Sequence, residues 1–176
     1  KHPLKLINSS GLIFLSMTLI PFDLAILITS RLVIPSKNES GIGVCNSSAL
    51  FLKKNEHQEI KTLVNHLAPN CKSNQKVKNV LSSESKGVYQ GKIYVKDIAQ
   101  KTNAYQLSKA LLLNDNAEFN SKPELEIYAD DVKCSHGATS GSLDEDSVHY
   151  LMTRGLNKEN STRLLIKGFL KQTLKK

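Results

Sequence analysis

A cysteine and a histidine lie two positions apart in residues 130–137, whose sequence is DDVKCSHG. This segment is predicted to be extended. Side chains of a strand alternate between its faces, so Cys134 and His136 would project from the same face, about 6 to 7 Å apart. Thiolate and imidazole are ligands for iron, zinc or an iron–sulfur cluster. Two donors fill only half of a tetrahedral site, so a metal bound here needs further ligands from elsewhere.

Two other interpretations of this short motif stay open. In the first, Cys134 is a buried core residue beside a surface histidine. In the second, Cys134 is a nucleophile activated by His136 as a base, although no glycine-rich elbow or oxyanion-hole loop is evident. The neighbouring Asp130 and Asp131 could orient the imidazole by hydrogen bonding, or form a turn between two strands.

The other cysteines give weaker signals. The three cysteines are widely spaced and contain no C-x-x-C pair, which favours reduced thiols over a disulfide framework. His66 and Cys71 could form a second site. Their spacing of five puts them on opposite faces of a strand, and Pro69 lies between them. We therefore expect both to be core or turn residues.

Composition limits the function classes. The chain has 176 residues, of which 40% are hydrophobic and 23% charged, enough for one core or for an elongated repeat structure. Its net charge of +8 permits loose attraction to polyanions. It has no tryptophan, only 6% aromatic residues and lysines scattered along the chain. This composition argues against nucleic-acid binding and favours solvated lysines.

The most apolar stretch covers residues 11–34 and is long enough to cross a bilayer. Pro21 and Asp23 lie at its middle. A central aspartate costs about 2.5 to 3.5 kcal/mol on insertion scales, and proline interrupts a helix. Buried strands are therefore preferred over a membrane span. The chain starts at Lys1, which suggests a fragment or a processed piece.

Short extended runs broken by turn residues dominate the middle of the chain and predict an all-β architecture, either a sandwich or a solenoid. Asparagines and small residues favour the solenoid. Residues 111–113 are three leucines followed by Asn114, Asp115 and Asn116, a pattern that predicts an inward apolar step and a polar corner. The runs are residues 49–52, 60–64, 77–81, 88–89, 92–95, 125–129 and 132–135.

The periodicity changes to helical near Ser142. The sequence Ser-Leu-Asp-Glu at 142–145 is a capping box, which predicts a helix start at Ser142. Gly155 can take the left-handed stop position after this helix. A second helix is predicted after a cap at Asn157, with apolar residues on more than one face. One of these faces can pack on the β-body while another remains available to a partner.

Residues 86–176 resemble the C-terminal part of the SufD branch of the SufB/SufD family, the scaffold proteins of iron–sulfur cluster assembly. SufB-type members usually carry a Glu-His-Glu-type segment where this chain has Lys-Cys-Ser-His, which favours the SufD branch. The segments that carry the resemblance are residues 87–93, 99–106, 111–113, 122–139, 143–145 and 154–155, with a further similarity over 65–71 and at Ser73.

The resemblance implies a mainly β fold, with a right-handed parallel β-helix (solenoid) core and a short C-terminal α-helical segment. It implies a scaffold without catalysis, which pairs with a SufB-like subunit through the β-helix and docks a SufC-like ABC ATPase through the C-terminal helices. Cys134 and His136 would lie at the subunit interface and contribute ligands to a transient iron–sulfur cluster or iron shared with SufB. We expect this chain to bind neither nucleotide nor nucleic acid directly, and we do not expect it to associate with a membrane. The implied location is the cytoplasm, or the plastid stroma in a plant or alga.

The resemblance is uneven along the chain. Residues 1–40 form a divergent apolar segment, in which the first coils are expected to be aberrant. Residues 41–141 are expected to form the β-helix core, and residues 142–176 the C-terminal helical segment.

Overall fold

A computed structural model describes residues 6–8, 11–13, 32–38 and 43–173 of the chain. These residues form ten strands followed by two helices. The strands are β1 (Leu6–Asn8), β2 (Gly11–Ile13), β3 (Leu32–Asn38), β4 (Gly43–Leu52), β5 (His57–His66), β6 (Lys72–Leu81), β7 (Lys86–Val95), β8 (Asn103–Leu112), β9 (Glu118–Ile127) and β10 (Lys133–Ser142). The helices are α1 (Glu145–Thr153) and α2 (Lys158–Lys171).

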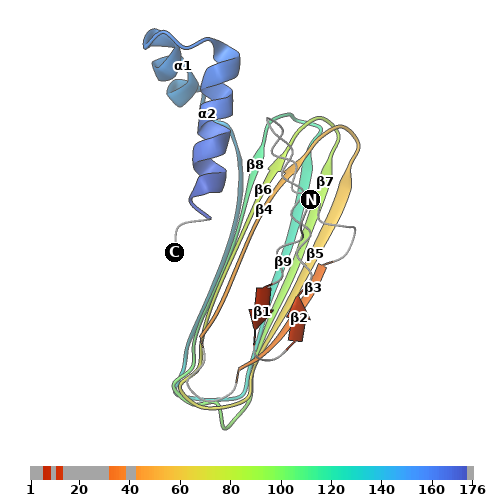
Figure 1. Ribbon diagram of the computed structural model, residues 1–176, viewed down its shortest axis with the longest axis vertical. Helices are drawn as coiled ribbons and strands as arrows, with labels where there is room; N and C mark the ends of the chain where they lie inside the picture. Colours follow the sequence, from red (N-terminus) through yellow and green to blue (C-terminus); the bar gives the residue numbers. More distant parts are fainter. Residues whose placement is uncertain (1–5, 9–10, 14–31, 39–42, 174–176) are drawn as a thin grey trace.

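Strands β3 to β10 form two four-stranded parallel sheets that face each other (Figure 1). The odd sheet has the order β3-β5-β7-β9 and the even sheet the order β10-β8-β6-β4. Each strand pairs with the strand two positions away along the chain, so one odd strand and the even strand after it form one coil. This architecture confirms the expected β-solenoid with C-terminal helices. Strands β1 and β2 form a separate antiparallel pair.

Alternate side chains of each strand point into the solenoid. In β5 and β7, buried positions alternate with half-exposed ones, as period-two patterning requires. The interior contains apolar clusters, one of them around Ile93 and Val95. It also contains polar residues, because Gln75 and Gln106 are 0% exposed and lie opposite each other in the register of β6 and β8.

Gly91 makes room for this polar interior. A β-carbon at Gly91 would overlap Gln106 Nε2 and the hydroxyl of Tyr89, and Gln106 Nε2 donates to the Gly91 carbonyl at 3.3 Å. The sequence predicted two separate runs around this glycine. This prediction was wrong, because β7 continues through Gly91 as a single strand. The glycine makes room for Tyr89 of its own strand and for Gln106 of the facing sheet, and it does not form a turn.

The turns of successive coils stack through backbone hydrogen bonds. The Asn70 N–H donates to the Gln100 carbonyl at 2.9 Å, and the Lys101 N–H donates to the Asp131 carbonyl at 2.6 Å. Asn70 and Lys101 have φ values of 61° and 60°, so left-handed residues recur at equivalent corners of two coils.

Local signals located the second helix better than the first. Asn157 caps α2 by accepting from the Asn160 N–H at 2.8 Å, as predicted. Gly155 has a φ of 94° after α1, which confirms its left-handed position. The predicted start at Ser142 is wrong, because Ser142 is the last residue of β10 and Asp144 is the N-cap of α1.

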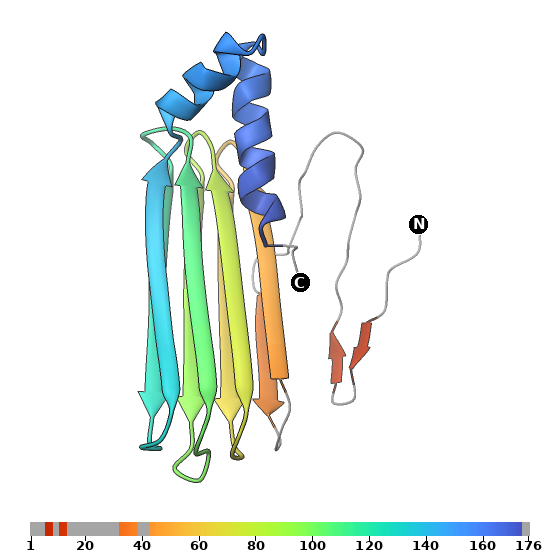
Figure 2. The ribbon, with the colours of Figure 1, turned by 90° about the vertical axis from the view of Figure 1, so that its left-hand side faces the viewer.

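Helix α2 lies against the outer side of the even sheet (Figure 2). Leu170 is 3% exposed and packs with Ala49 and Val80, which are outward residues of β4 and β6. Leu111 joins this cluster, whereas Leu112 packs in the interior. The expected inward step of three leucines is therefore wrong, because strand alternation sends Leu111 to the helix and Leu112 to the core.

Part of the apolar stretch of residues 11–34 is described. Strand β3 continues the odd sheet into it, with Leu32 opposite Ile60 in the register with β5. Residues 14–31, which include Pro21 and Asp23, lie outside the described residues. Among the described residues, no helix is both long enough and apolar enough to span a membrane.

Candidate functional site

Cys134 and His136 lie on the last coil of the solenoid. Their strand, β10, is the edge of the even sheet and pairs only with β8. Strand β9 is the corresponding edge of the odd sheet. Within the described residues no further coil covers this end, and Ile127, an inward residue of β9, is 38% exposed. The site therefore opens onto two unpaired strand edges, which are templates for pairing with another chain.

Cys134 is half-buried at the inner side of β10. It packs against the cluster that contains Ile93, Val95 and Ala104, and Ala104 is its register partner on β8. Burial raises the pKa of the Cys134 thiol, and a hydrogen bond from the Ala104 backbone opposes part of this rise. The thiol is thus protonated at neutral pH, and a nucleophilic cysteine needs the opposite shift.

His136 occupies the next inward position of β10 and is exposed. Its register partner is Gln106, which in turn lies opposite Gln75. His136 therefore ends a column of polar residues that runs through the interior. The alternation of β10 places Cys134 and His136 on one face, as the sequence predicted.

The two aspartates before β10 form a turn. The Val132 N–H donates to the Asp130 carbonyl at 3.2 Å, and the Asp131 N–H donates to Gln100 Oε1 at 2.9 Å. In the described part of the chain, neither carboxylate is hydrogen-bonded to His136. The turn interpretation agrees with these contacts, and orientation of the imidazole by a carboxylate does not.

The described residues contain no group of three or more histidine, cysteine or acidic side chains able to hold a metal ion. Cys134 and His136 offer two donors of the types that iron and iron–sulfur clusters accept. The remaining donors would have to come from a molecule that covers the open coil.

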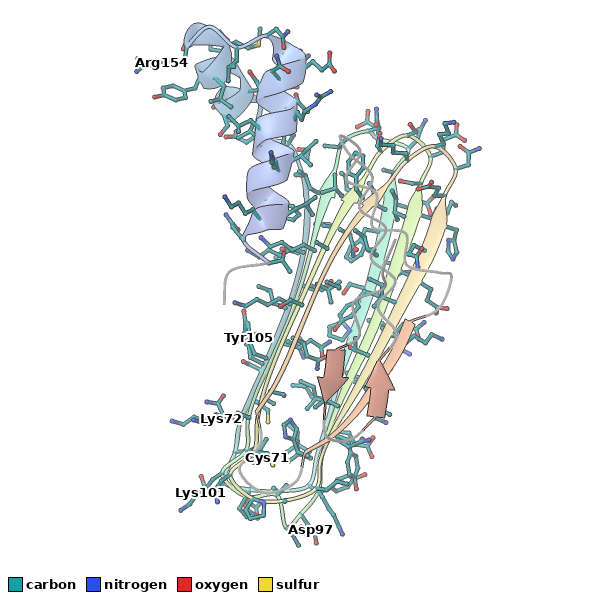
Figure 3. All side chains as sticks on the ribbon, in the orientation of Figure 1. Cys71, Lys72, Asp97, Lys101, Tyr105 and Arg154 are labelled. Atoms are coloured by element: carbon teal, nitrogen blue, oxygen red, sulfur yellow. The ribbon has the colours of Figure 1, made fainter. Side chains whose placement is uncertain are left out.

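His66 and Cys71 are core residues, as predicted, and both are 0% exposed. His66 Nε2 and the Ser73 hydroxyl lie 2.9 Å apart. Burial lowers the pKa of His66 to about 4, so the imidazole is neutral at neutral pH. Figure 3 shows Cys71 at the turn end of the solenoid.

Sequence reasoning missed the polar column beneath His136. Gln75, Gln106 and His136 follow one another at intervals of 31 and 30 residues, and each pair is in register. This coil period could have identified the column. The repeat is hard to see in the sequence because the turns differ in length. In addition, equivalent positions of successive coils carry different residue types.

A second surface lies between the two helices. An open groove is lined by Asp144, Asp146, Ser147, Tyr150, Leu151, Leu164 and Leu165. Tyr150 is 57% exposed and Leu164 is 50% exposed. The other side of α2 packs on the even sheet, so the apolar residues of this helix serve two faces.

Comparison with known proteins gives consistent matches. The family model described as "SUF system FeS cluster assembly, SufBD core domain" matches residues 36–169. The iron-sulfur cluster assembly protein SufD of Escherichia coli (strain K12) is 40% identical over 124 residues, which cover 70% of this chain and 29% of that protein.

Relatives from photosynthetic organisms match as well. An iron-sulfur cluster assembly SufBD family protein of Synechocystis is 45% identical over 111 residues, covering 63% of this chain and 24% of the relative. The chloroplastic protein ABCI7 of Arabidopsis thaliana is 44% identical over 97 residues, covering 55% and 20%. The chain thus spans less than a third of the length of each of these three relatives.

Proposed function

Since this chain belongs to the SufB/SufD family and is SufD-like, we propose that it is a non-catalytic scaffold subunit of a complex that assembles iron–sulfur clusters. A SufB-like subunit pairs with the open end of the solenoid. A SufC-like ABC ATPase docks on the C-terminal helices. The observation that carries the proposal is the position of Cys134 and His136 at inward sites of the β9–β10 coil, an end coil of the described solenoid.

The open coil suits a partner of the same architecture. Strands β9 and β10 present backbone groups that can extend each sheet. Phe119 and Leu125 of β9 add half-buried apolar side chains at inward positions of this coil. A partner that covers this end would desolvate Cys134 further and bring donors to it. A nascent cluster or iron shared with the SufB-like subunit then has Cys134 and His136 as ligands from this chain.

The helices suit the second partner. The groove between α1 and α2 combines exposed apolar side chains with the acidic residues Asp144 and Asp146. Apolar patches with a polar rim are typical of protein interfaces. In this assignment residues 41–141 provide the core, 142–176 provide the docking segment, and 1–40 form the divergent start. The chain works in the cytoplasm, or in the plastid stroma if it comes from a plant or alga.

The two alternatives have less support. A thiol enzyme requires an activated Cys134, whereas burial raises the pKa of this thiol. A solenoid that only binds proteins, without metal, predicts that loss of the thiol changes nothing. The experiment below separates this alternative from the scaffold.

The test is anaerobic co-purification of the chain with SufB-like and SufC-like partners, followed by counting of iron and acid-labile sulfide. Cys134→Ala and His136→Ala are expected to retain both partners and to lose iron and sulfide. The matched control is Ser135→Ala, because Ser135 lies between them and faces outward. Iron that persists in Cys134→Ala favours the metal-free module, and loss of both partners from the wild-type chain contradicts the scaffold proposal.

A further inference from the structure

The outer face of the even sheet has an unusual charge distribution. The outward positions of β6, β8 and β10 hold five lysines, namely Lys72, Lys76, Lys78, Lys109 and Lys133, and no aspartate or glutamate. Figure 3 shows Lys72 and Tyr105 on this outer side, beyond the end of α2, with Lys101 at the turn below them. We call this surface the lysine face.

On the odd sheet, by comparison, lysines on the outer side are paired with glutamates. On its outer side Lys61 lies 3.0 Å from Glu59, Lys86 lies 3.1 Å from Glu118, and Lys122 lies 3.0 Å from Glu124. Lys92 also pairs with Glu126. On the lysine face, by contrast, Lys76, Lys109 and Lys133 form no ion pair within the described part of the chain.

Lys78 lies among other positive charges on this face. Burial lowers the pKa of Lys78, and the charges of Lys109 and Lys76 lower it further. Lys78 is 5% exposed and is compensated by the C-terminal end of α2, where its Nζ donates to the Phe169 carbonyl at 2.8 Å. The helix end therefore stabilises the charge of Lys78, whereas Lys76, Lys109 and Lys133 have no such contact within the described residues. Helix α2 cannot neutralise them, because its one acidic residue, Glu159, pairs with Arg163.

We propose that the lysine face is a docking surface for an acidic protein. Charge complementarity identifies this partner, because the outward positions of three adjacent strands are cationic and include no acidic side chain. The face extends about 10 Å across the strands and about 20 Å along them, from Lys72 to Lys78. This area is small compared with about 800 Å² per partner in a stable interface, so the contact is transient and its main effect is to accelerate association.

The side-chain chemistry distinguishes protein carboxylates from nucleic acid. The outward positions of the three strands include no arginine and one aromatic residue, Tyr105. Arginine supplies the bidentate fork that matches phosphates, and aromatic rings supply the platforms on which bases stack. Lysine acts as a point charge on a flexible stem, which suits carboxylates spread over a protein surface. The inference does not depend on the proposed cluster site, which lies on the inward side of β10.

The test uses the full chain and labelled poly-L-glutamate as the probe, followed by fluorescence anisotropy at about 50 and about 200 mM salt. The face variant replaces Lys76, Lys109 and Lys133 by glutamine. The control variant replaces Lys61, Lys86 and Lys122 of the odd sheet by glutamine, so both variants lose the same net charge. We expect the face variant to lose affinity about tenfold or more, and the control less than about threefold.

Two further measurements keep the result decisive. Arginine at the same three positions retains the charge and is expected to retain poly-L-glutamate binding. A single-stranded oligonucleotide of equal charge is expected to bind more weakly than poly-L-glutamate. Equal losses in the face and control variants would show that only net charge matters and would overturn the proposal. So would absence of binding by the wild-type chain, or tighter oligonucleotide binding through the same lysines.

Discussion

The ammonium group of Lys78 on β6 contacts both the backbone carbonyl and the aromatic ring of Phe169 on α2. The Lys78 Nζ donates to the Phe169 carbonyl at 2.8 Å and lies 4.4 Å from the centroid of the Phe169 ring. It also donates to Gln172 Oε1 at 2.7 Å. Because the last carbonyls of a helix have no partner within it and carry partial negative charge, a buried lysine there fixes the helix end to the sheet.

Replacement of Lys78 by methionine should therefore release the end of α2. Methionine keeps much of the apolar stem but removes the charge and its hydrogen bonds, which is expected to cost about 1 to 3 kcal/mol of unfolding free energy. Hydrogen exchange in the last turn of α2 should accelerate. The control is Lys76→Met on the same face of β6. Unchanged exchange in Lys78→Met would show that apolar packing alone holds the helix.

The stability of the chain should depend on pH through His66. The unfolded imidazole takes up a proton near pH 6.5, whereas the buried one does so only near pH 4. The contribution of neutral His66 is therefore complete above pH 6.5 and is lost as pH falls toward 4, by about 3 kcal/mol. Denaturant titrations across this range should show a smaller dependence for His66→Gln. The exposed His57→Gln serves as the control, and equal slopes in all three proteins would rule out this assignment.

Gly91→Ala should destabilise the fold. The added β-carbon would overlap Gln106 Nε2 and the Tyr89 hydroxyl. Both residues are fully buried in the solenoid interior. Overpacking of this kind typically costs about 1 to 3 kcal/mol. Gly141→Ala on β10 is the matched control, because no atom lies within 4 Å of its added β-carbon. Thermal melting compares the two, and equal melting temperatures would contradict the close packing around Gly91.

Cys134 should react slowly with iodoacetamide at neutral pH. Its raised pKa keeps the thiol protonated, so the alkylation rate should rise only at a higher pH than for glutathione. Mass spectrometry assigns the modified cysteine, with fully buried Cys71 as the internal control. Fast alkylation of Cys134 at pH 7 would instead support the nucleophile interpretation.

Period-two patterning and local caps accounted for much of the fold. The face shared by Cys134 and His136 follows from alternation alone, and the cap at Asn157 follows from one side chain. The different exposure of Cys134 and His136 could not be predicted. It depends on which residues of β8 lie beneath Cys134 and His136, and on the fact that β10 is the edge strand of the described even sheet.

The errors have a common physical origin in contacts between distant segments. Ser142 and Asp144 can both cap a helix, but pairing of β10 with β8 extends to Ser142 and leaves the cap to Asp144. Lys78 lies in a strand with the spacing of a solvated face. It is buried because the end of α2, whose Phe169 follows Lys78 by 91 residues, lies over it.

The seven strands from β4 to β10 have ten residues each, whereas the turns between them differ in length. Insertions and deletions are consequently tolerated only at the corners. One residue added to a turn lengthens a loop, but one residue added within a strand would exchange the interior and exterior of everything up to the next corner. Related sequences should therefore keep the strand lengths and vary in the lengths of the corners. The corners are accordingly the natural sites for epitope tags or grafted loops.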